Sequence, residues 1–276
     1  LRFAAKALRD VVFSLIAKPV HIKVPPRQAI FVFSYFDSRN DDSGVLREEY
    51  FRGILEGRSD MYCFYKIVSS GNFLRGVQYL RLISKLKKSF HAYGENSFIS
   101  LFIIVKALCL TLVHFFKFAS YKFPADTDRT LVSLLKSEHL REILDGTVYF
   151  GYQQKLLFEK LLKYQPKLIL SVWENKPWER VLESVKKRIS PSTISKGFQH
   201  TGFSKKLLQH YPSSVEGDLD TYPDYIINNG LINRDELANN SVVSSNIIVG
   251  GALRQDSMLR AGVPKIKDIV SERPIN

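Results

Sequence analysis

Apolar and polar segments alternate along the chain in a way that predicts strands separated by helices. Ala29–Ser34 is apolar on both faces of an extended strand, which is typical of a parallel sheet covered on both sides. Five further segments have the length and composition of strands: Met61–Val68, Leu168–Trp173, Ser192–Gln199, Tyr225–Ile227 and Asn246–Gly251. The intervening segments carry apolar residues at helical spacing: Phe3–Ala17, Arg47–Leu55, Phe73–Lys88, Gln153–Tyr164 and Trp178–Arg188.

This alternation predicts an α/β fold, a Rossmann-like open parallel sheet with helices on both faces. Three regions are expected along the chain. Residues 1–26 form an N-terminal amphipathic helix and linker, residues 27–235 the Rossmann-like domain, and residues 236–276 the start of a second domain. The chain begins without Met and ends soon after a new unit opens, so we expect it to be cut at both ends. Its scattered basic residues make the N-terminal helix unlike a signal peptide.

Phe98–Ala119 is the most apolar stretch of the chain. It is long enough to span a bilayer, which needs about 20 apolar residues. Lys106 and His114 interrupt it, and both would be costly in hydrocarbon. The pattern therefore favours a buried or groove-lining helix, with contact to a membrane surface and a true span as the alternatives.

The chain carries a formal net charge of +13, which favours a polyanionic neighbour. No zinc-finger spacing or aromatic RNA-binding motif is present, so an anionic membrane or a phosphate-bearing substrate is expected rather than nucleic acid. The two cysteines, Cys63 and Cys109, lie in apolar surroundings and suit a reducing cytoplasm, as buried thiols without a disulfide.

Polar loops after three predicted strands carry candidate chemistry. Glu174 follows one strand and precedes a helix, where a carboxylate can act as a base toward a hydroxyl or simply cap the helix. Gln199 and His200 lie between glycines in GFQHTG, which suits a phosphate or sugar site or a tight turn. Asn228 and Asn229 end a third strand, where the structural interpretation is stronger and Gly230 is expected to adopt a positive φ.

Several enzyme classes are excluded by their missing motifs. The chain has no Gly-x-Ser-x-Gly elbow, no P-loop and no Gly-x-Gly-x-x-Gly fingerprint. No His, Asp or Glu cluster has the spacing of metal ligands. A metal-independent protein without a bound cofactor is therefore expected.

The sequence resembles the bacterial surface-carbohydrate and capsular-polysaccharide glycosyltransferases of GT-B-like fold. The residues that carry the resemblance are WENKPWE at 173–179, GFQHTG at 197–202 and PDYIINNG at 223–230, with weaker support from Tyr35–Asp37 and Gly250–Arg254. The resemblance covers roughly residues 29–254 and implies that this chain is the N-terminal, acceptor-side half of a two-domain enzyme.

The resemblance also implies roles for individual residues. Glu174 would be the catalytic base or acceptor orienter, and His200 and Gln199 would contact the donor phosphate or stabilise the leaving group. Asp37, Arg39 and Asn40 would shape the acceptor pocket. Asn175, Thr201 and Asn229 lie in the same or neighbouring loops and complete the candidate substrate-binding set. The donor is a nucleotide-sugar and no metal is required.

The implied reaction moves a sugar from the nucleotide-sugar to a growing, lipid-linked glycan at the cytoplasmic face of the membrane, as a peripheral membrane enzyme. Two alternatives remain open. One is a sugar-nucleotide epimerase of the same fold, which needs no acceptor. The other is a non-enzymatic assembly protein that binds membrane or polyanion through its basic face.

Overall fold

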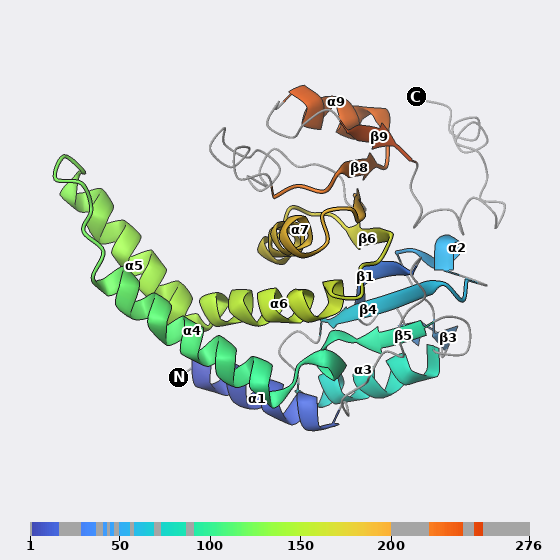
Figure 1. Ribbon diagram of the computed structural model, residues 1–276, viewed down its shortest axis with the longest axis horizontal. Helices are drawn as coiled ribbons and strands as arrows, with labels where there is room; N and C mark the ends of the chain where they lie inside the picture. The colour runs from blue at the N-terminus through green and yellow to red at the C-terminus, as the bar shows by residue number, and fades with distance from the viewer. Residues whose placement is uncertain are drawn as a thin grey trace, which may run out of the picture.

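The computed structural model describes residues 2–16, 29–36, 41–42, 45–46, 50–55, 58–68, 73–86, 91–199, 221–239 and 246–250 (Figure 1). Seven parallel strands form one sheet in the order β5-β4-β1-β6-β7-β8-β9. Their bounds are β1 (Ile30–Phe36), β4 (Met61–Ile67), β5 (His91–Gly94), β6 (Leu168–Val172), β7 (Ile194–Phe198), β8 (Tyr225–Asn228) and β9 (Ile247–Val249). The predicted α/β fold, an open Rossmann-like parallel sheet, is confirmed.

Helices connect and cover these strands. They are α1 (Arg2–Ile16), α2 (Arg52–Leu55), α3 (Phe73–Leu86), η2 (Glu95–Phe98), α4 (Leu101–Ala119), α5 (Arg129–Asp145), α6 (Thr147–Leu162), α7 (Pro177–Ile189) and α9 (Leu231–Asn239). The short strands β2 (Asp41–Asp42) and β3 (Val45–Leu46) form a separate antiparallel pair. Helix α3 packs against β4 and β5, and α9 packs against β8 and β9.

The strand order reverses direction between β1 and β6. From β1 the chain adds β4 and then β5 on one side, and afterwards β6, β7, β8 and β9 on the other. Ile30 pairs with Leu168 and Phe33 with Ser171 across the reversal. In open α/β sheets such a reversal leaves a crevice beyond the carboxyl ends of the two strands, where ligands bind. The edge formed by the ends of β1 and β6 is therefore the first place to look for a site.

Aromatic packing makes β1 a rigid centre for that edge. All seven residues of β1 are buried, as the unbroken apolar run predicts. The ring of Phe33 stacks on Phe64 with centroids 5.2 Å apart and meets Phe158 of α6 edge-on at 5.4 Å. Each such side chain contributes about 1.5–3 kcal/mol when it is removed from water. The strand ends that carry polar groups are thus fixed by a dense core.

Three helical segments differ from the prediction. Of the helix expected around Arg47–Leu55, the described residues show α2 at Arg52–Leu55 after bends at Tyr50 and Phe51, and Val45–Leu46 is the short strand β3. The helix expected from Gln153 begins at Thr147, directly after Gly146 with φ 83°. Gly146 ends α5 in the left-handed conformation and lets α6 start at once, a junction that apolar periodicity alone does not reveal. α5 and β5 were not predicted.

Helix α4 is less buried than its composition suggests. Its most apolar window has a mean hydropathy of 2.0, yet only 22% of that window is buried. Figure 1 shows α4 and α5 as a hairpin that extends away from the sheet, so only one face of α4 meets the rest of the protein. The expectation of a buried or groove-lining helix is wrong for the outer face. Cys63 is buried as expected, whereas Cys109 on α4 is exposed.

Candidate functional site

Charged and polar side chains gather where β1, β4, β5 and β6 end. We call this group the carboxyl-edge cluster; its members are Tyr35, Lys66, Glu95, Gln154, Glu174, Lys176, Trp178 and Glu179. Tyr35 and Lys66 are register partners near the ends of β1 and β4. Glu95 follows β5 directly, and Glu174 lies two residues after β6. Five elements of the fold thus deliver side chains to the strand-order reversal.

The first turn of α7 is held by Glu179. Pro177 occupies the first helical position, where its missing N–H costs nothing. Oε2 of Glu179 accepts the backbone N–H of Lys176 at 3.2 Å and that of Glu174 at 2.9 Å. A glutamate at the third helical position that reaches back to the N-cap N–H is half of a capping box. Glu179 therefore fixes the loop on which Glu174 stands.

The Glu174 carboxylate makes a different contact. It forms an ion pair with the Lys176 ammonium. The Glu174 side chain is 12% exposed and the Lys176 side chain 41%, so the pair lies at the border between protein and solvent. Glu179 thus accepts the backbone N–H groups at the start of α7, while the Glu174 carboxylate pairs with Lys176. Glu174 is the carboxylate of this loop that is held beside a cation and in partial contact with solvent.

Two aromatic side chains join the loop to the neighbouring strands. The indole N–H of Trp178 donates to the Tyr35 hydroxyl at 2.9 Å. The Lys176 ammonium lies 5.0 Å from the centre of the Tyr35 ring, and the Lys66 ammonium lies 4.5 Å from the Trp178 ring. Burial, and then the negative charges of Glu179 and Glu174, raise the pKa of Tyr35, so its hydroxyl stays protonated.

Lys66 and Glu95 form the deeper part of the cluster. Gln154 of α6 lies between them, accepting from Lys66 Nζ at 3.3 Å and donating to Glu95 Oε2 at 3.4 Å. Burial lowers the pKa of Lys66 to about 8, although Glu95 and Glu179 oppose the shift. Burial likewise raises the pKa of Glu95. Both groups sit where their charged forms are poorly solvated, a pattern that is typical of functional sites.

Some buried polar atoms at this edge have no hydrogen-bond partner among the residues that the structure describes. They are Oε1 of Glu179, Oε1 of Glu95 and both amide atoms of Asn228 at the end of β8. All three side chains are almost wholly buried. A buried polar atom without a partner costs about 1–3 kcal/mol, so proteins keep few of them. Burial also raises the pKa of Glu179 to about 8.

The residues predicted from the sequence have different outcomes. Asp37, Arg39, Asn40, His200 and Thr201 lie outside the described residues. Gln199 is buried just after β7, and its backbone N–H donates to the Ile227 carbonyl at 2.9 Å. Asn175 adopts φ 55°, a conformation that asparagine tolerates, and its Oδ1 accepts from Arg180 at 3.0 Å.

The end of β8 carries the last predicted residue. The side-chain oxygen of Asn229 accepts a hydrogen bond from Asn233 in α9, whereas the neighbouring Asn228 is the buried one. Gly230 does not have a positive φ, so that part of the expectation is wrong, although the chain does bend there between β8 and α9. Helix α9 begins at the next residue, and its first turn continues from Gly230, whose carbonyl accepts from Arg234 N–H at 3.1 Å.

Among the members of the cluster, sequence patterns assigned a role to Glu174 alone. Other members in its WENKPWE segment, Glu179 among them, received no role of their own. Lys66 is the single charged residue of the strand MYCFYKI, which is a recognisable signal because a lysine in a buried strand is uncommon. Glu95 and Gln154 lie in a short turn and a mid-helix position, where polar residues are ordinary.

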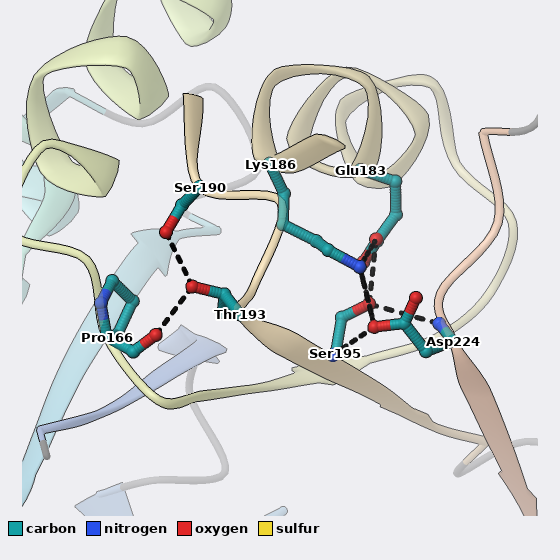
Figure 2. A network of polar contacts seen from close by, with 7 residues as sticks. All are labelled: Pro166, Glu183, Lys186, Ser190, Thr193, Ser195 and Asp224. Atoms are coloured by element: carbon teal, nitrogen blue, oxygen red, sulfur yellow. Dashed lines mark hydrogen bonds and ion pairs between the residues drawn. The ribbon is translucent and has the colours of Figure 1, made fainter. Parts of the chain in front are cut away.

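A second polar network lies at the opposite edge of the sheet, and Figure 2 shows it. We call Glu183, Lys186, Ser195 and Asp224 the amino-edge cluster, since Ser195 and Asp224 lie where β7 and β8 begin. Lys186 Nζ donates to Asp224 Oδ2 at 2.6 Å and to Ser195 Oγ at 3.2 Å. Ser195 Oγ donates to Glu183 Oε2 at 2.8 Å, and the Asp224 N–H donates to Ser195 Oγ at 3.1 Å.

The amino-edge cluster fastens α7 to the starts of β7 and β8. Burial raises the pKa of Glu183 to about 7. Burial opposes ionisation of Asp224 too, but Lys186 and the Ser195 N–H hold its pKa below the ordinary value. A separate set of hydrogen bonds nearby joins Ser190 to Thr193 and Thr193 to the Pro166 carbonyl (Figure 2). Within the described residues, no buried side-chain atom of this cluster lacks a hydrogen-bond partner.

The described residues contain no group of three His, Cys, Asp or Glu side chains that could hold a metal ion. No family model, curated protein or solved structure shows significant similarity to this chain.

Proposed function

We propose that this protein is a glycosyltransferase that moves a sugar from a nucleotide-sugar to a growing, lipid-linked surface polysaccharide, and that the carboxyl-edge cluster is its acceptor site. In this proposal the described sheet is the acceptor-side domain of a GT-B-like architecture. The resemblance of the WENKPWE, GFQHTG and PDYIINNG segments to bacterial surface-carbohydrate glycosyltransferases motivates the reaction class.

One observation carries the proposal: carboxylates and aromatic rings meet at the strand-order reversal. Glu174, Glu179 and Glu95 come from separate loops and helices to the ends of β1, β4 and β6. Oε1 of Glu179 and Oε1 of Glu95 accept nothing from the described residues. Carboxylate oxygens accept hydrogen bonds from hydroxyl groups, and sugars present many hydroxyls. A carbohydrate acceptor therefore suits this edge better than an apolar ligand.

The chemistry assigned to Glu174 is that of a general base. Its carboxylate would accept the proton of the acceptor hydroxyl while the hydroxyl oxygen forms a bond to the anomeric carbon of the donor sugar. The bond from that carbon to the nucleotide phosphate breaks, and the nucleoside phosphate leaves with the electron pair. Because Glu179 holds the Glu174 and Lys176 N–H groups, Glu179 acts as a positioning residue for the base.

The partners follow from the same proposal. The donor phosphate would meet Gln199 and His200, and Asp37, Arg39 and Asn40 would line the acceptor pocket together with Asn175, Thr201 and Asn229. The acceptor is lipid-linked, which places the protein on the cytoplasmic face of the membrane. The net charge of +13 suits an anionic membrane surface.

The test is a transfer assay on the full-length protein with a panel of nucleotide-sugars and a membrane lipid extract. The proposal expects labelled sugar in the lipid fraction, with the signal greatly reduced by Glu174→Gln and not by Glu138→Gln. Glu138 is the matched control, because the same substitution is made at an exposed position of α5, in the hairpin that extends away from the sheet.

Two other outcomes would replace the proposal. Conversion of the nucleotide-sugar into an isomer without any acceptor would establish a sugar-nucleotide epimerase. No turnover, together with binding to anionic vesicles that Glu174→Gln leaves intact, would favour a non-enzymatic assembly protein.

A further inference from the structure

The outer face of α4 is an apolar stripe that faces solvent. Its members are Leu101, Phe102, Val105, Cys109, Leu112, Val113 and Phe116, all exposed. Phe102 is 72% exposed and Phe116 is 66% exposed, values that are high for phenylalanine in a folded protein. Successive helical residues turn by about 100°, and on that wheel these seven side chains fall within one third of the circumference. They form a continuous strip about 22 Å long.

The opposite face of α4 is firmly attached to the protein. Ile103, Ile104, Ala107 and Thr111 are buried there. His114 contacts the Tyr152 hydroxyl of α6 at 3.0 Å and Nε2 of His139 in α5 at 2.8 Å. A helix that crossed a bilayer would have to leave these contacts, and both of its ends lead back to strands of the same sheet. The stripe is therefore placed to lie along a surface rather than to span one.

The charged residues of α1 and α4 indicate which kind of surface the stripe would contact. Helices α1 and α4 together contain five basic residues, Arg2, Lys6, Arg9, Lys106 and Lys117, and a single acidic one, Asp10. Asp10 is buried and accepts from Gln153 at 2.9 Å. On the helical wheel Lys106 and Lys117 border the apolar stripe on one side. This arrangement of an apolar strip edged by lysines is typical of helices that lie in the interface of an anionic membrane.

Helix α1, which lies beside α4, also exposes apolar side chains. α1 packs against α4 and α5, and its own exposed residues include Leu8, Leu15 and Ile16. Tyr121, directly beyond α4, is exposed as well, and tyrosine is favoured at the level of lipid headgroups. A second copy of this chain is a poorer occupant, because two stripes facing each other would bring like-charged lysines together without an exposed acid on either α4.

We propose that the α4 stripe, edged by Lys106 and Lys117, docks this protein in the plane of an anionic lipid bilayer. The inference rests on the membrane location proposed above and names the surface responsible for it. The apolar side chains enter the headgroup region, and the lysine ammonium groups stay with the lipid phosphates. The membrane then holds the lipid-linked acceptor near the sheet that carries the carboxyl-edge cluster.

Co-sedimentation of the full-length protein with vesicles tests the docking surface. Vesicles of phosphatidylcholine alone are compared with vesicles that contain phosphatidylglycerol. We expect binding to the anionic vesicles, weakened at 1 M salt, and release by alkaline carbonate. Phe102→Glu with Phe116→Glu should lower partitioning by on the order of tenfold for each ring. Lys106→Gln with Lys117→Gln should lower it by a smaller factor on anionic vesicles only.

Leu74→Glu is the matched control, because Leu74 is 72% exposed on α3 and lies outside the stripe. Equal binding by Leu74→Glu and the double phenylalanine variant would overturn the proposal. Resistance to carbonate would indicate a spanning helix instead. A dimer that light scattering detects in the wild type and not in the phenylalanine variant, without vesicle binding, would assign the stripe to self-association.

The docking surface and the transferase reaction can fail separately. With a water-soluble acceptor analogue, the double phenylalanine variant should transfer sugar at the wild-type rate while it fails to sediment with vesicles. Vesicle binding that persists when no sugar transfer is found would support the surface and contradict the reaction.

Discussion

Helix α7 contributes to two clusters of buried charged residues, one at its amino terminus and one in its second half. The two clusters differ in whether all their buried polar atoms have hydrogen-bond partners. At its amino terminus, Glu179 belongs to the carboxyl-edge cluster and keeps one carboxylate oxygen without a partner among the described residues. In its second half, Lys186 and Glu183 belong to the amino-edge cluster, where each charge faces an opposite charge or a hydroxyl. The same helix thus supports one closed network and one open network.

The difference separates stability from function. A closed network of buried charges holds elements together, since removal of one member leaves another uncompensated. An open network costs free energy in the folded protein and is retained where something else supplies the missing contacts. We infer that the amino edge of the sheet fastens α7 to β7 and β8, whereas the carboxyl edge is kept for a ligand.

The largest effect is expected from Lys186→Met. This change keeps most of the side-chain volume but leaves Glu183 and Asp224 facing each other in a buried site. The free energy of unfolding should fall by about 3 kcal/mol, the lower part of the range for a broken buried pair, because Asp224 is partly exposed. Urea unfolding followed by circular dichroism measures it. A loss that Glu183→Gln does not partly relieve in the double variant would argue against a closed network.

Glu174→Gln tests the functional role proposed for the carboxyl-edge cluster. Removal of a general base typically lowers turnover by about 100-fold or more, which corresponds to about 2.7 kcal/mol in the barrier. The free energy of unfolding should change by less than about 1 kcal/mol, because the carboxylate lies at the border with solvent. Transfer kinetics and urea unfolding on the same preparation check both parts. An unchanged rate would remove Glu174 from the proposed site.

Glu179→Gln tests the open network through its pH dependence. Burial raises the pKa of Glu179 to about 8 in the folded protein, far above the value of an unfolded glutamate. Between these two values the unfolded chain has released the proton that the folded protein still holds. The contribution of Glu179 to the wild-type unfolding free energy therefore decreases as pH rises from about 4.5 to 8, by about 1.4 kcal/mol for every tenfold fall in proton concentration.

In Glu179→Gln that decrease should be shallower, so the variant gains stability relative to the wild type as pH approaches 8. Urea midpoints at pH 5, 6.5 and 8 give the comparison. Parallel pH profiles for the two proteins would show that Glu179 is not held in its protonated form. Burial lowers the pKa of Lys66 to about 8. Lys66 therefore makes the unfolding free energy increase with pH, and it does so only above about pH 8.

The smallest effect is expected from Ser195→Ala. The change removes a hydroxyl that bridges Glu183, Lys186 and Asp224, while the direct Lys186–Asp224 pair at 2.6 Å remains. The free energy of unfolding should decrease by about 1–2 kcal/mol. The rate of sugar transfer per folded molecule should stay as in the wild type, since Ser195 lies at the other edge of the sheet. A loss of turnover without a loss of stability would contradict the assignment of the amino-edge cluster to stability.

The fold could be predicted from the sequence because its central strands are continuous apolar segments. β1 is buried at all seven positions and β6 at four of five, so the apolar runs at Ala29 and Leu168 had one consistent interpretation. The parts that were missed depend on context. Glycine at 146 joins α5 and α6 without a loop, and the exposure of α4 follows from a hairpin that extends beyond the sheet (Figure 1).

The candidate site could be predicted only in part. The position of Glu174 after β6 follows from the strand boundary, so its place at the carboxyl edge could be foreseen. That Glu179 rather than Glu174 caps α7 depends on side-chain direction within one turn. Lys66 and Glu95 meet through Gln154, which is 88 residues from one and 59 from the other along the chain. No local pattern encodes such a contact.

The most direct test of the division between the two edges is a side-by-side transfer assay of Glu174→Gln and Ser195→Ala in the full-length protein, with rates corrected for the folded fraction. The account predicts that Glu174→Gln loses about 100-fold in turnover and keeps its stability, while Ser195→Ala loses stability and keeps its turnover. Equal losses of turnover in the two variants, or a loss confined to Ser195→Ala, would contradict it.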